Sequence, residues 1–236
     1  MNSLVEERRF KEELYELVAR IAKAAASPPR LEILEVLAQG PRTVESLARE
    51  TALSVANASR HLQVLRQAGL VESRKQGTFV EYRLADAQIF DLLRVLRGIA
   101  ERRLGDAERL VRSFLGERDD FEPVGRKELL ARARSGSAVV LDVRPRGEYR
   151  AGHIAGAISI PVDELRRRLR ELPARKEIVA YCRGPYCLMA FDAVDILRRQ
   201  GRRARRLVEG FPEWRAAGLP VEGGEVDQSR ERTIDG

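Results

Sequence analysis

Apolar side chains recur at every third or fourth position through most of the first half of the chain. This spacing predicts an amphipathic helix over residues 4–26, ended by the proline pair that begins at Pro28. It predicts a second helix over residues 30–39, which Gly40 closes. A longer stripe over residues 86–115 predicts one further helix, and an apolar stripe of that length needs a partner to cover it.

Two short helices and a hairpin are predicted between these longer helices. Thr43 and Ser54 each have the position and chemistry of a helix N-cap, and the second of these helices ends at about Ala68. The stretches 70–73 and 79–84 then flank a polar turn with a glycine at its tip, which predicts a β-hairpin.

The pattern changes after residues 116–120, a short polar and charged segment. Short apolar runs at 138–143, 157–160 and 178–181 then alternate with segments of helical spacing. This alternation predicts an α/β domain with a mainly parallel central sheet.

A chain of 236 residues is long enough for two domains of ordinary size. We place a mostly α-helical domain at residues 1–118 and the α/β domain at residues 119–222, and we expect the polar residues 223–236 to be disordered. The charged amino terminus lacks the apolar core of a signal peptide, and no apolar run is long enough to span a membrane. We therefore expect a soluble, cytoplasmic protein that makes no contact with a membrane.

The net charge of +7 supports nucleic-acid binding only weakly, because residues 1–120 are close to neutral and most of the excess lies in the second half. A local excess of cations over residues 54–83 is more informative and predicts a surface that faces phosphates. The arginine-rich runs at 166–168 and 202–206 are interpreted as solvated faces that add at most nonspecific DNA affinity.

The run from Leu53 to Val71, LSVANASRHLQVLRQAGLV, resembles the recognition helix of ArsR-like repressors. The run from Ser27 to Leu34 and the predicted hairpin also match that family, so the resemblance covers roughly residues 15–85. It implies a winged helix-turn-helix domain, with the hairpin as the wing. It also implies a homodimer formed through the long terminal helices, with two recognition helices that bind a palindromic operator in double-stranded DNA.

Helical spacing divides the recognition helix into a buried and an outward face. Ala58, Leu62 and Leu65 fall on one face and are expected in the core. The candidate DNA contacts are the outward positions and the wing cations: Ser54, Ala56, Asn57, Ser59, Arg60, His61, Gln63, Arg74 and Lys75.

Several of these side chains suit particular DNA groups. Arg60 suits guanine or a phosphate, Asn57 suits adenine, and Ala56 suits the methyl group of thymine. The two wing cations are expected to hold phosphates, and His61 to pack or to touch a phosphate. A helix-turn-helix that binds another protein is the alternative for this domain.

Many ArsR-like proteins sense metals through cysteine pairs in the helix before the recognition helix, or through Asp and His on the last helix. In this chain the helix before the recognition helix contains SLARE, residues 46–50, with no cysteine, and the predicted last helix has no His or Cys. The chain has two histidines, far apart in sequence. We expect neither a metal site nor a cofactor.

Six short motifs within residues 122–222 resemble, in order, those of a single rhodanese domain. They are LDVR (141–144), EY (148–149), GHIAGA (152–157), IP (160–161), YCRG (181–184) and EGFPEW (209–214). The resemblance implies that Cys182 carries sulfur as a persulfide. Asp142, with Arg144, Glu148 and His153, matches family positions and is expected to brace the sulfur-carrying loop more than to do chemistry.

Cys182 ends an apolar strand and opens a loop into a predicted helix over residues 188–200, where backbone N–H groups and the helix dipole favour an anion. Arg183 and Gly184 follow, and Arg183 adds a positive charge suited to an anionic donor. The implied reaction is ping-pong: Cys182 takes sulfane sulfur from a donor such as thiosulfate or polysulfide and passes it to a thiol or cyanide. Rhodanese-like phosphatases and arsenate reductases have an arginine where this chain has Leu188, so oxyanion transfer is disfavoured.

Cys187, the only other cysteine, departs from the common rhodanese pattern. One interpretation is a resolving thiol that attacks the Cys182 persulfide and forms a disulfide or polysulfide bridge. The other is a small residue at the start of a helix.

The leading hypothesis is a dimeric repressor whose DNA affinity changes when Cys182 is persulfidated or oxidised. The alternative is an active thiosulfate or persulfide sulfurtransferase whose DNA binding is regulated independently. A third possibility is a rhodanese-like domain without activity that serves only for interactions.

Overall fold

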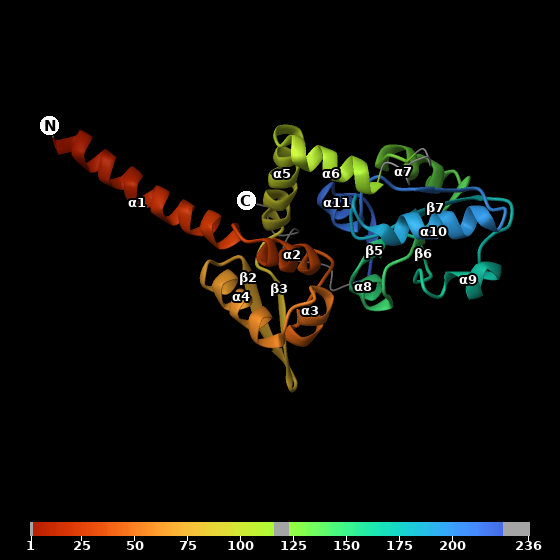
Figure 1. The fold of residues 1–236 in the computed structure, drawn as a ribbon, viewed down its shortest axis with the longest axis horizontal. Coiled ribbons are helices and arrows are strands. Elements are labelled where there is room, and N and C mark those ends of the chain that lie inside the picture. Colours follow the sequence, from red (N-terminus) through yellow and green to blue (C-terminus); the bar gives the residue numbers. More distant parts are fainter. Residues whose placement is uncertain (1, 116–122, 224–236) are drawn as a thin grey trace, which may run out of the picture. The chain divides into compact units, whose positions relative to one another are not determined.

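The computed structural model describes residues 2–115 and 123–223. The chain divides into two compact units, residues 1–98 and 99–236 (Figure 1). The domain boundary predicted at residues 118 and 119 lies outside the described residues, as do residues 224–236 of the predicted tail.

The first unit combines a helical core with an antiparallel sheet of strand order β1-β3-β2 (Figure 1). Its elements are α1 (Asn2–Ala25), α2 (Pro28–Leu37), β1 (Arg42–Thr43), α3 (Val44–Glu50), α4 (Val55–Gln67), β2 (Val71–Gln76), β3 (Phe79–Leu84) and the first part of α5 (Gln88–Arg103). This is the winged helix-turn-helix arrangement, with α3 and α4 as the helix pair.

The two predicted N-caps are confirmed. The Thr43 hydroxyl accepts a hydrogen bond from the Ser46 amide at 3.3 Å, and the Ser54 hydroxyl accepts one from the Asn57 amide at 3.2 Å. Gly69 follows α4 with a φ of 74°, which ends the helix as expected. Local side-chain chemistry thus sets both ends of α4.

The wing is longer than the sequence predicts. Strand β2 continues to Gln76, and only Gly77, with a φ of 60°, and Thr78 form the turn. Arg74 and Lys75 therefore lie in the strand, paired with Glu81 and Val80, and not in the turn. Polar side chains extend a strand here because both faces of the hairpin tip are exposed.

The prediction of a single helix over residues 86–115 is wrong. Two helices occupy this stretch, α5 (Gln88–Arg103) and α6 (Gly105–Leu115), with Leu104 between them. Glycine is unfavourable within a helix, and Asp106 and Glu108 favour the start of a new one because carboxylates stabilise the amino-terminal end of the dipole.

The second unit is an α/β domain with a four-stranded parallel sheet of order β6-β4-β7-β8. A separate antiparallel pair joins β5 and β9. Beyond α6, its elements are α7 (Arg126–Arg134), β4 (Ala138–Asp142), α8 (Arg146–Ala151), β5 (His153–Ile154), β6 (Ile158–Ser159), α9 (Leu165–Arg168), the 3-10 helix Leu169–Glu171, β7 (Glu177–Tyr181), α10 (Leu188–Arg199), β8 (Ala204–Arg206), α11 (Phe211–Ala216) and β9 (Val221–Glu222).

The sheet separates two apolar clusters because alternate strand residues point to opposite faces. Ile178, Ala180 and Cys182 pack with α10 on one face. Val179 and Tyr181 pack on the other face with the cluster that contains Trp214 of α11. Three predicted strands of this parallel sheet are confirmed.

The interpretation of residues 202–206 as a solvated face is wrong, because β8 forms there. Ala204 and Arg206 are buried, and the Arg206 guanidinium lies 4.3 Å from the centre of the Phe191 ring. Arg205, on the opposite face, pairs with Glu128 at 3.2 Å. Stacking and ion pairing thus accommodate arginine in an edge strand of the sheet.

Leu62 offers a test of the first unit's core, since its side chain is fully buried. We expect Leu62→Ala to lower the free energy of unfolding of this unit by about 2–5 kcal/mol, because it removes apolar contacts and leaves a cavity. Urea unfolding followed by a probe in the first unit measures the loss. The neighbouring exposed substitution Gln63→Ala should change stability by about 0.5 kcal/mol or less; equal losses in both variants would contradict this packing.

Candidate functional site: a cysteine loop and a DNA-facing helix

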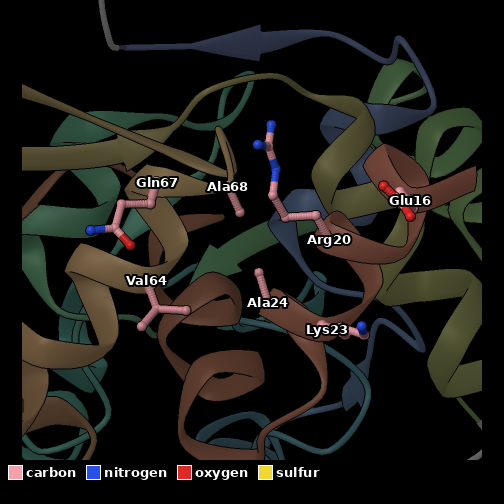
Figure 2. Close-up of a pocket in the computed structure, with 7 residues that line it drawn as sticks. All are labelled: Glu16, Arg20, Lys23, Ala24, Val64, Gln67 and Ala68. Atoms are coloured by element: carbon pink, nitrogen blue, oxygen red, sulfur yellow. The ribbon is translucent and has the colours of Figure 1, made fainter. Parts of the chain in front are cut away.

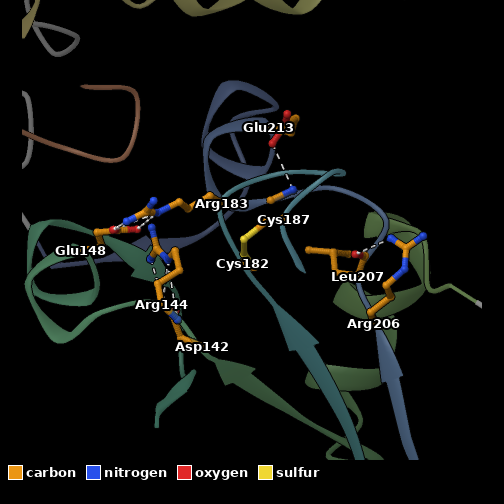
Figure 3. Close-up of a disulfide and its surroundings, with 10 residues drawn as sticks. Asp142, Arg144, Glu148, Cys182, Arg183, Cys187, Arg206, Leu207 and Glu213 are labelled. Atoms are coloured by element: carbon orange, nitrogen blue, oxygen red, sulfur yellow. Dashed lines mark hydrogen bonds and ion pairs between the residues drawn. A yellow bond between two sulfur atoms is a disulfide. The ribbon is translucent and has the colours of Figure 1, made fainter. Parts of the chain in front are cut away.

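The loop from Cys182 to Cys187, here called the sulfur loop, joins the carboxyl end of β7 to α10. Cys182 is 1% exposed, and its sulfur is bonded to that of Cys187, with the two Cα atoms 6.2 Å apart (Figure 3). The Cys187 amide donates to the Gly184 carbonyl at 3.1 Å, and Cys187 is the N-cap residue of α10. The structure therefore unites the two cysteines that the sequence singled out.

Arg183 does not face the sulfur atoms. Its guanidinium extends toward Glu148 of α8, with Nε 3.0 and 3.2 Å from the two carboxylate oxygens (Figure 3). The Glu148 side chain is 2% exposed and that of Arg183 is 26% exposed. A bidentate pair of this kind fixes one side of the sulfur loop and neutralises the positive charge of Arg183.

Asp142 lies beneath the sulfur loop in a buried hydrogen-bond network. Arg144 donates to Asp142 from Nη2 at 2.7 Å and to the Gly152 carbonyl at 2.7 Å, and both partners of the ion pair are fully buried. Burial lowers the pKa of Arg144, but the hydrogen bonds and charge of Asp142 outweigh this effect and raise it. Arg144 therefore keeps its positive charge.

Tyr181 completes this network. Its hydroxyl donates to Asp142 at 2.5 Å and accepts from the Ile154 amide at 3.1 Å. Burial, together with the Asp142 charge, raises the pKa of Tyr181, so the hydroxyl keeps its proton. These contacts hold the end of β7, the residue before Cys182, against β4 and β5.

Gly210 packs directly against the backbone of the sulfur loop and was not predicted to matter there. A Cβ atom at this position would lie 2.4 Å from the backbone of Arg183 and Gly184, so only glycine allows so close an approach. The next residue, Phe211, donates its amide to the Cys182 carbonyl at 3.1 Å. Gly210 is part of the motif EGFPEW, and that membership was the only sign in the sequence that this glycine matters.

Tyr186 and Glu101 are a second pair that the sequence did not reveal. The Tyr186 hydroxyl, within the sulfur loop, donates a hydrogen bond to the Glu101 carboxylate. Glu101 lies in the last turns of α5 and belongs to the second unit. The two residues are 85 positions apart, and nothing in their local sequence indicates the contact.

Most side chains that helical spacing placed on the outward face of α4 are exposed, whereas Ser59 is half-buried. Ala58, Leu62 and Leu65 are fully buried, as predicted. The exposed candidates are Ser54, Ala56, Asn57, Arg60, Gln63, Arg74 and Lys75, and the half-buried ones are Ser59 and His61. The exposed surface of α4 therefore carries polar and cationic side chains.

A hollow of about 350 Å³ lies between α1 and the carboxyl end of α4 (Figure 2). Its lining mixes charged and small apolar side chains: Glu16, Arg20, Lys23, Ala24, Val64, Gln67 and Ala68.

No three His, Cys, Asp or Glu side chains within residues 2–115 and 123–223 are grouped to hold a metal ion. In that same part of the chain, no helix combines the length and apolar character needed to cross a membrane.

Comparisons with known proteins match both units. The family model described as "Bacterial regulatory protein, arsR family" matches residues 27–73, and the rhodanese-like domain model matches residues 125–217. The HTH-type transcriptional regulator Rv0324 of Mycobacterium tuberculosis is 47% identical over 214 residues, which cover 91% of this chain and 94% of that protein.

Solved structures resemble each unit separately. One is described as the homodimeric winged helix-turn-helix DNA-binding domain of a possible ArsR-family regulator from Mycobacterium bovis; it is 41% identical and covers 40% of this chain and 87% of its own, with a TM-score of 0.38. A rhodanese-related protein from Thermoplasma volcanium is 27% identical and covers 43% of this chain and 98% of its own, with a TM-score of 0.39. Because of the relative from Mycobacterium tuberculosis and the two family-model matches, the chain belongs to the ArsR family of HTH-type transcriptional regulators, in a form that carries a carboxyl-terminal rhodanese-like domain.

Proposed function

We propose that this regulator is a DNA-binding repressor whose affinity for its operator depends on the sulfur state of Cys182, with Cys187 as the resolving thiol. The observation that carries the proposal is the bond between the two sulfur atoms within a loop held by Arg183 and Gly210. A loop that converts between a disulfide and two thiols gives a transcription regulator a way to respond to sulfur chemistry.

The sulfur chemistry balances without an external oxidant. A donor R–S–SH and the Cys182 thiol give R–SH and the persulfide Cys182–S–SH. The Cys187 thiol then attacks the Cys182 sulfur, which forms the Cys182–Cys187 disulfide and releases hydrogen sulfide. The sulfane sulfur of the donor is reduced as the two thiols are oxidised.

Dimer formation is supported by apolar side chains left exposed on the terminal helices. Those of α1 are Leu4, Val5, Phe10, Leu14, Leu17 and Val18; those of α5 and α6 are Val95, Leu96, Ile99, Leu110 and Phe114. Stripes of this size on helices indicate an interface with another copy. The Mycobacterium bovis relative is described as homodimeric, and a symmetric pair of α4 helices suits a palindromic site.

The contact between Tyr186 and Glu101 supplies a route from the sulfur loop to the DNA-binding unit. Glu101 is near the end of α5, whereas Ile89 in the first turn of α5 packs in the core around α2 and α4. A change in the loop that alters the Tyr186 hydrogen bond biases the position of α5. Coupling of this kind requires that the two loop states differ in their contact energy with that helix.

A sulfurtransferase remains the second candidate, favoured by the rhodanese-like match over residues 125–217 and by the position of Cys182 at the end of β7, in the loop that leads to α10. Steady release of sulfite from thiosulfate, lost in Cys182→Ser, would favour the enzyme. Stable loading without turnover would favour the sensor.

Arg60 is the first residue to test on the DNA side, since it is exposed on the outward face of α4. We expect Arg60→Ala to weaken operator binding by about 1–3 kcal/mol, because one guanine or phosphate contact is lost. Gel-shift titration at fixed salt measures the affinity. Arg199→Ala, an exposed arginine of α10, is the matched control and should bind as the parent does; equal weakening in both would remove Arg60 from the interface.

Cys182 is the residue to test on the sulfur side. We expect polysulfide to lower the operator affinity of the reduced protein about tenfold or more, which corresponds to a coupling of roughly 1.4 kcal/mol. Cys182→Ser should abolish the effect, whereas Cys187→Ala should keep the persulfide but form no disulfide. If Cys187→Ala releases DNA as the parent does, Cys187 is not the resolving thiol of the switch.

Tyr186→Phe tests the route to α5. The variant keeps the aromatic ring but loses the hydroxyl that donates to Glu101, so polysulfide should still load Cys182 while its effect on DNA affinity falls. Mass spectrometry follows loading, and operator titration follows affinity. Tyr149→Phe is the control, because it removes a hydroxyl that binds the Ala157 carbonyl elsewhere in the same unit; an unchanged response in Tyr186→Phe would rule out this route.

A further inference from the structure

The amino-terminal ends of β4, β7 and β8 lie together at one end of the parallel sheet, because these strands pair side by side in the same direction. The sulfur loop leaves β7 at the opposite end of the sheet. Three segments lead into the amino-terminal strand ends: residues 132–138 into β4, residues 163–177 into β7 and residues 195–205 into β8. These three segments are here called the basic end.

Contacts made by arginine side chains hold the three segments of the basic end together. Arg202 donates to a carbonyl of the 3-10 helix at 3.4 Å, and Arg203 donates to the carbonyl of Arg175 at 3.1 Å. Glu177, the first residue of β7, forms an ion pair with Arg132 of α7. The charges of the three segments therefore belong to one surface of the second unit.

The basic end accounts for the whole net charge of the chain. Its segments contain 13 Lys and Arg against six Asp and Glu, when Glu128 of α7 is counted because it pairs with Arg132 and Arg205. The net charge of this surface is then +7, and that of the whole chain is also +7, so all other residues together are neutral. A concentration of charge of this kind attracts polyanions.

Several cations of the basic end are exposed and not neutralised. Within residues 2–115 and 123–223, no carboxylate pairs with six of its exposed cations: Arg134, Arg166, Arg167, Arg170, Arg175 and Lys176. Arg202 and Arg203 donate to backbone carbonyls, which order the two guanidinium groups without cancelling their charge. The charge of this surface is therefore free to act on phosphates.

We propose that the basic end is a second DNA-contacting surface, which binds the phosphate backbone of duplex DNA outside the bases that α4 contacts. The chain belongs to a family of transcriptional regulators, so duplex DNA is the polyanion that it meets. Once α4 is bound, the adjoining duplex is present at a high effective concentration for the second unit. Contacts of this kind add affinity and salt dependence but no sequence preference.

Arg175→Gln combined with Lys176→Gln tests this surface by removing two exposed charges. The carbonyl of Arg175 that accepts from Arg203 is kept in this variant. We expect the affinity of the full, reduced chain for a DNA duplex of random sequence to fall about tenfold at about 0.1 M salt. The slope of log affinity against log salt should become shallower by about two, since about one unit is lost with each phosphate contact. Fluorescence anisotropy with a labelled duplex measures both quantities.

Lys127→Gln combined with Arg150→Gln is the matched control. It also removes one exposed lysine and one exposed arginine from the second unit, but from the first turn of α7 and from α8, outside the basic end. Affinity and slope should be those of the parent. Arg166→Gln combined with Arg167→Gln removes two other charges of the basic end and should weaken binding as the first pair does, which keeps the test decisive if the first pair fails to fold.

Two results would overturn the proposal. Equal losses in the control pair and in the pairs of the basic end would show a general effect of net charge, and an unchanged salt slope in both pairs of the basic end would remove this surface from the DNA. Vesicles of phosphatidylglycerol test the other polyanion: if both pairs lose vesicle binding but hold DNA as the parent does, the surface fits a membrane instead. The measurements contain no sulfur donor, so failure here leaves the proposed response of Cys182 standing.

Discussion

The buried ion pair between Asp142 and Arg144 is the constraint on which the geometry of the sulfur loop depends. It joins three segments that are distant in sequence: Asp142 ends β4, Arg144 also binds the Gly152 carbonyl before β5, and Tyr181 of β7 donates to the same carboxylate. Two buried charges cost several kcal/mol each to desolvate, so the pair is stable only with every remaining hydrogen bond in place. This requirement fixes the strand end from which Cys182 emerges.

Local pattern predicted most of the architecture because the determinants lie close together in sequence. The N-caps at Thr43 and Ser54, the buried face of α4 and three strands of the parallel sheet all follow from spacing of a few residues. The failures have local causes too. Gly105 and two acidic residues divide one expected helix into two. The arginines of β8 made that strand look like a solvent-exposed segment in the sequence, whereas in the structure an aromatic ring and a carboxylate accommodate their side chains.

The candidate site was only half predictable for a different physical reason. Both cysteines belong to one short segment, so their chemistry was evident from sequence. Glu148 and Glu101 reach the sulfur loop only through the fold: Glu148 pairs with Arg183, 35 positions away, and Glu101 accepts from Tyr186, 85 positions away. From the sequence alone, Arg183 was expected to offer its positive charge to an anionic donor, whereas in the structure that charge is paired with Glu148.

The anchors of the sulfur loop also determine which part of it is able to report a change. Arg183 is tied to Glu148, the backbone of Arg183 and Gly184 rests on Gly210, and Cys182 is held by its carbonyl to Phe211. When the bond to Cys187 opens or closes, the resulting displacement of the backbone then falls on Pro185 and Tyr186. These are the two residues between the anchored part of the loop and Cys187. Proline restricts its own backbone, so the displacement falls mainly on Tyr186, the residue whose hydroxyl contacts α5. Under the proposed function, the change in a single covalent bond is thereby transmitted to one hydrogen bond.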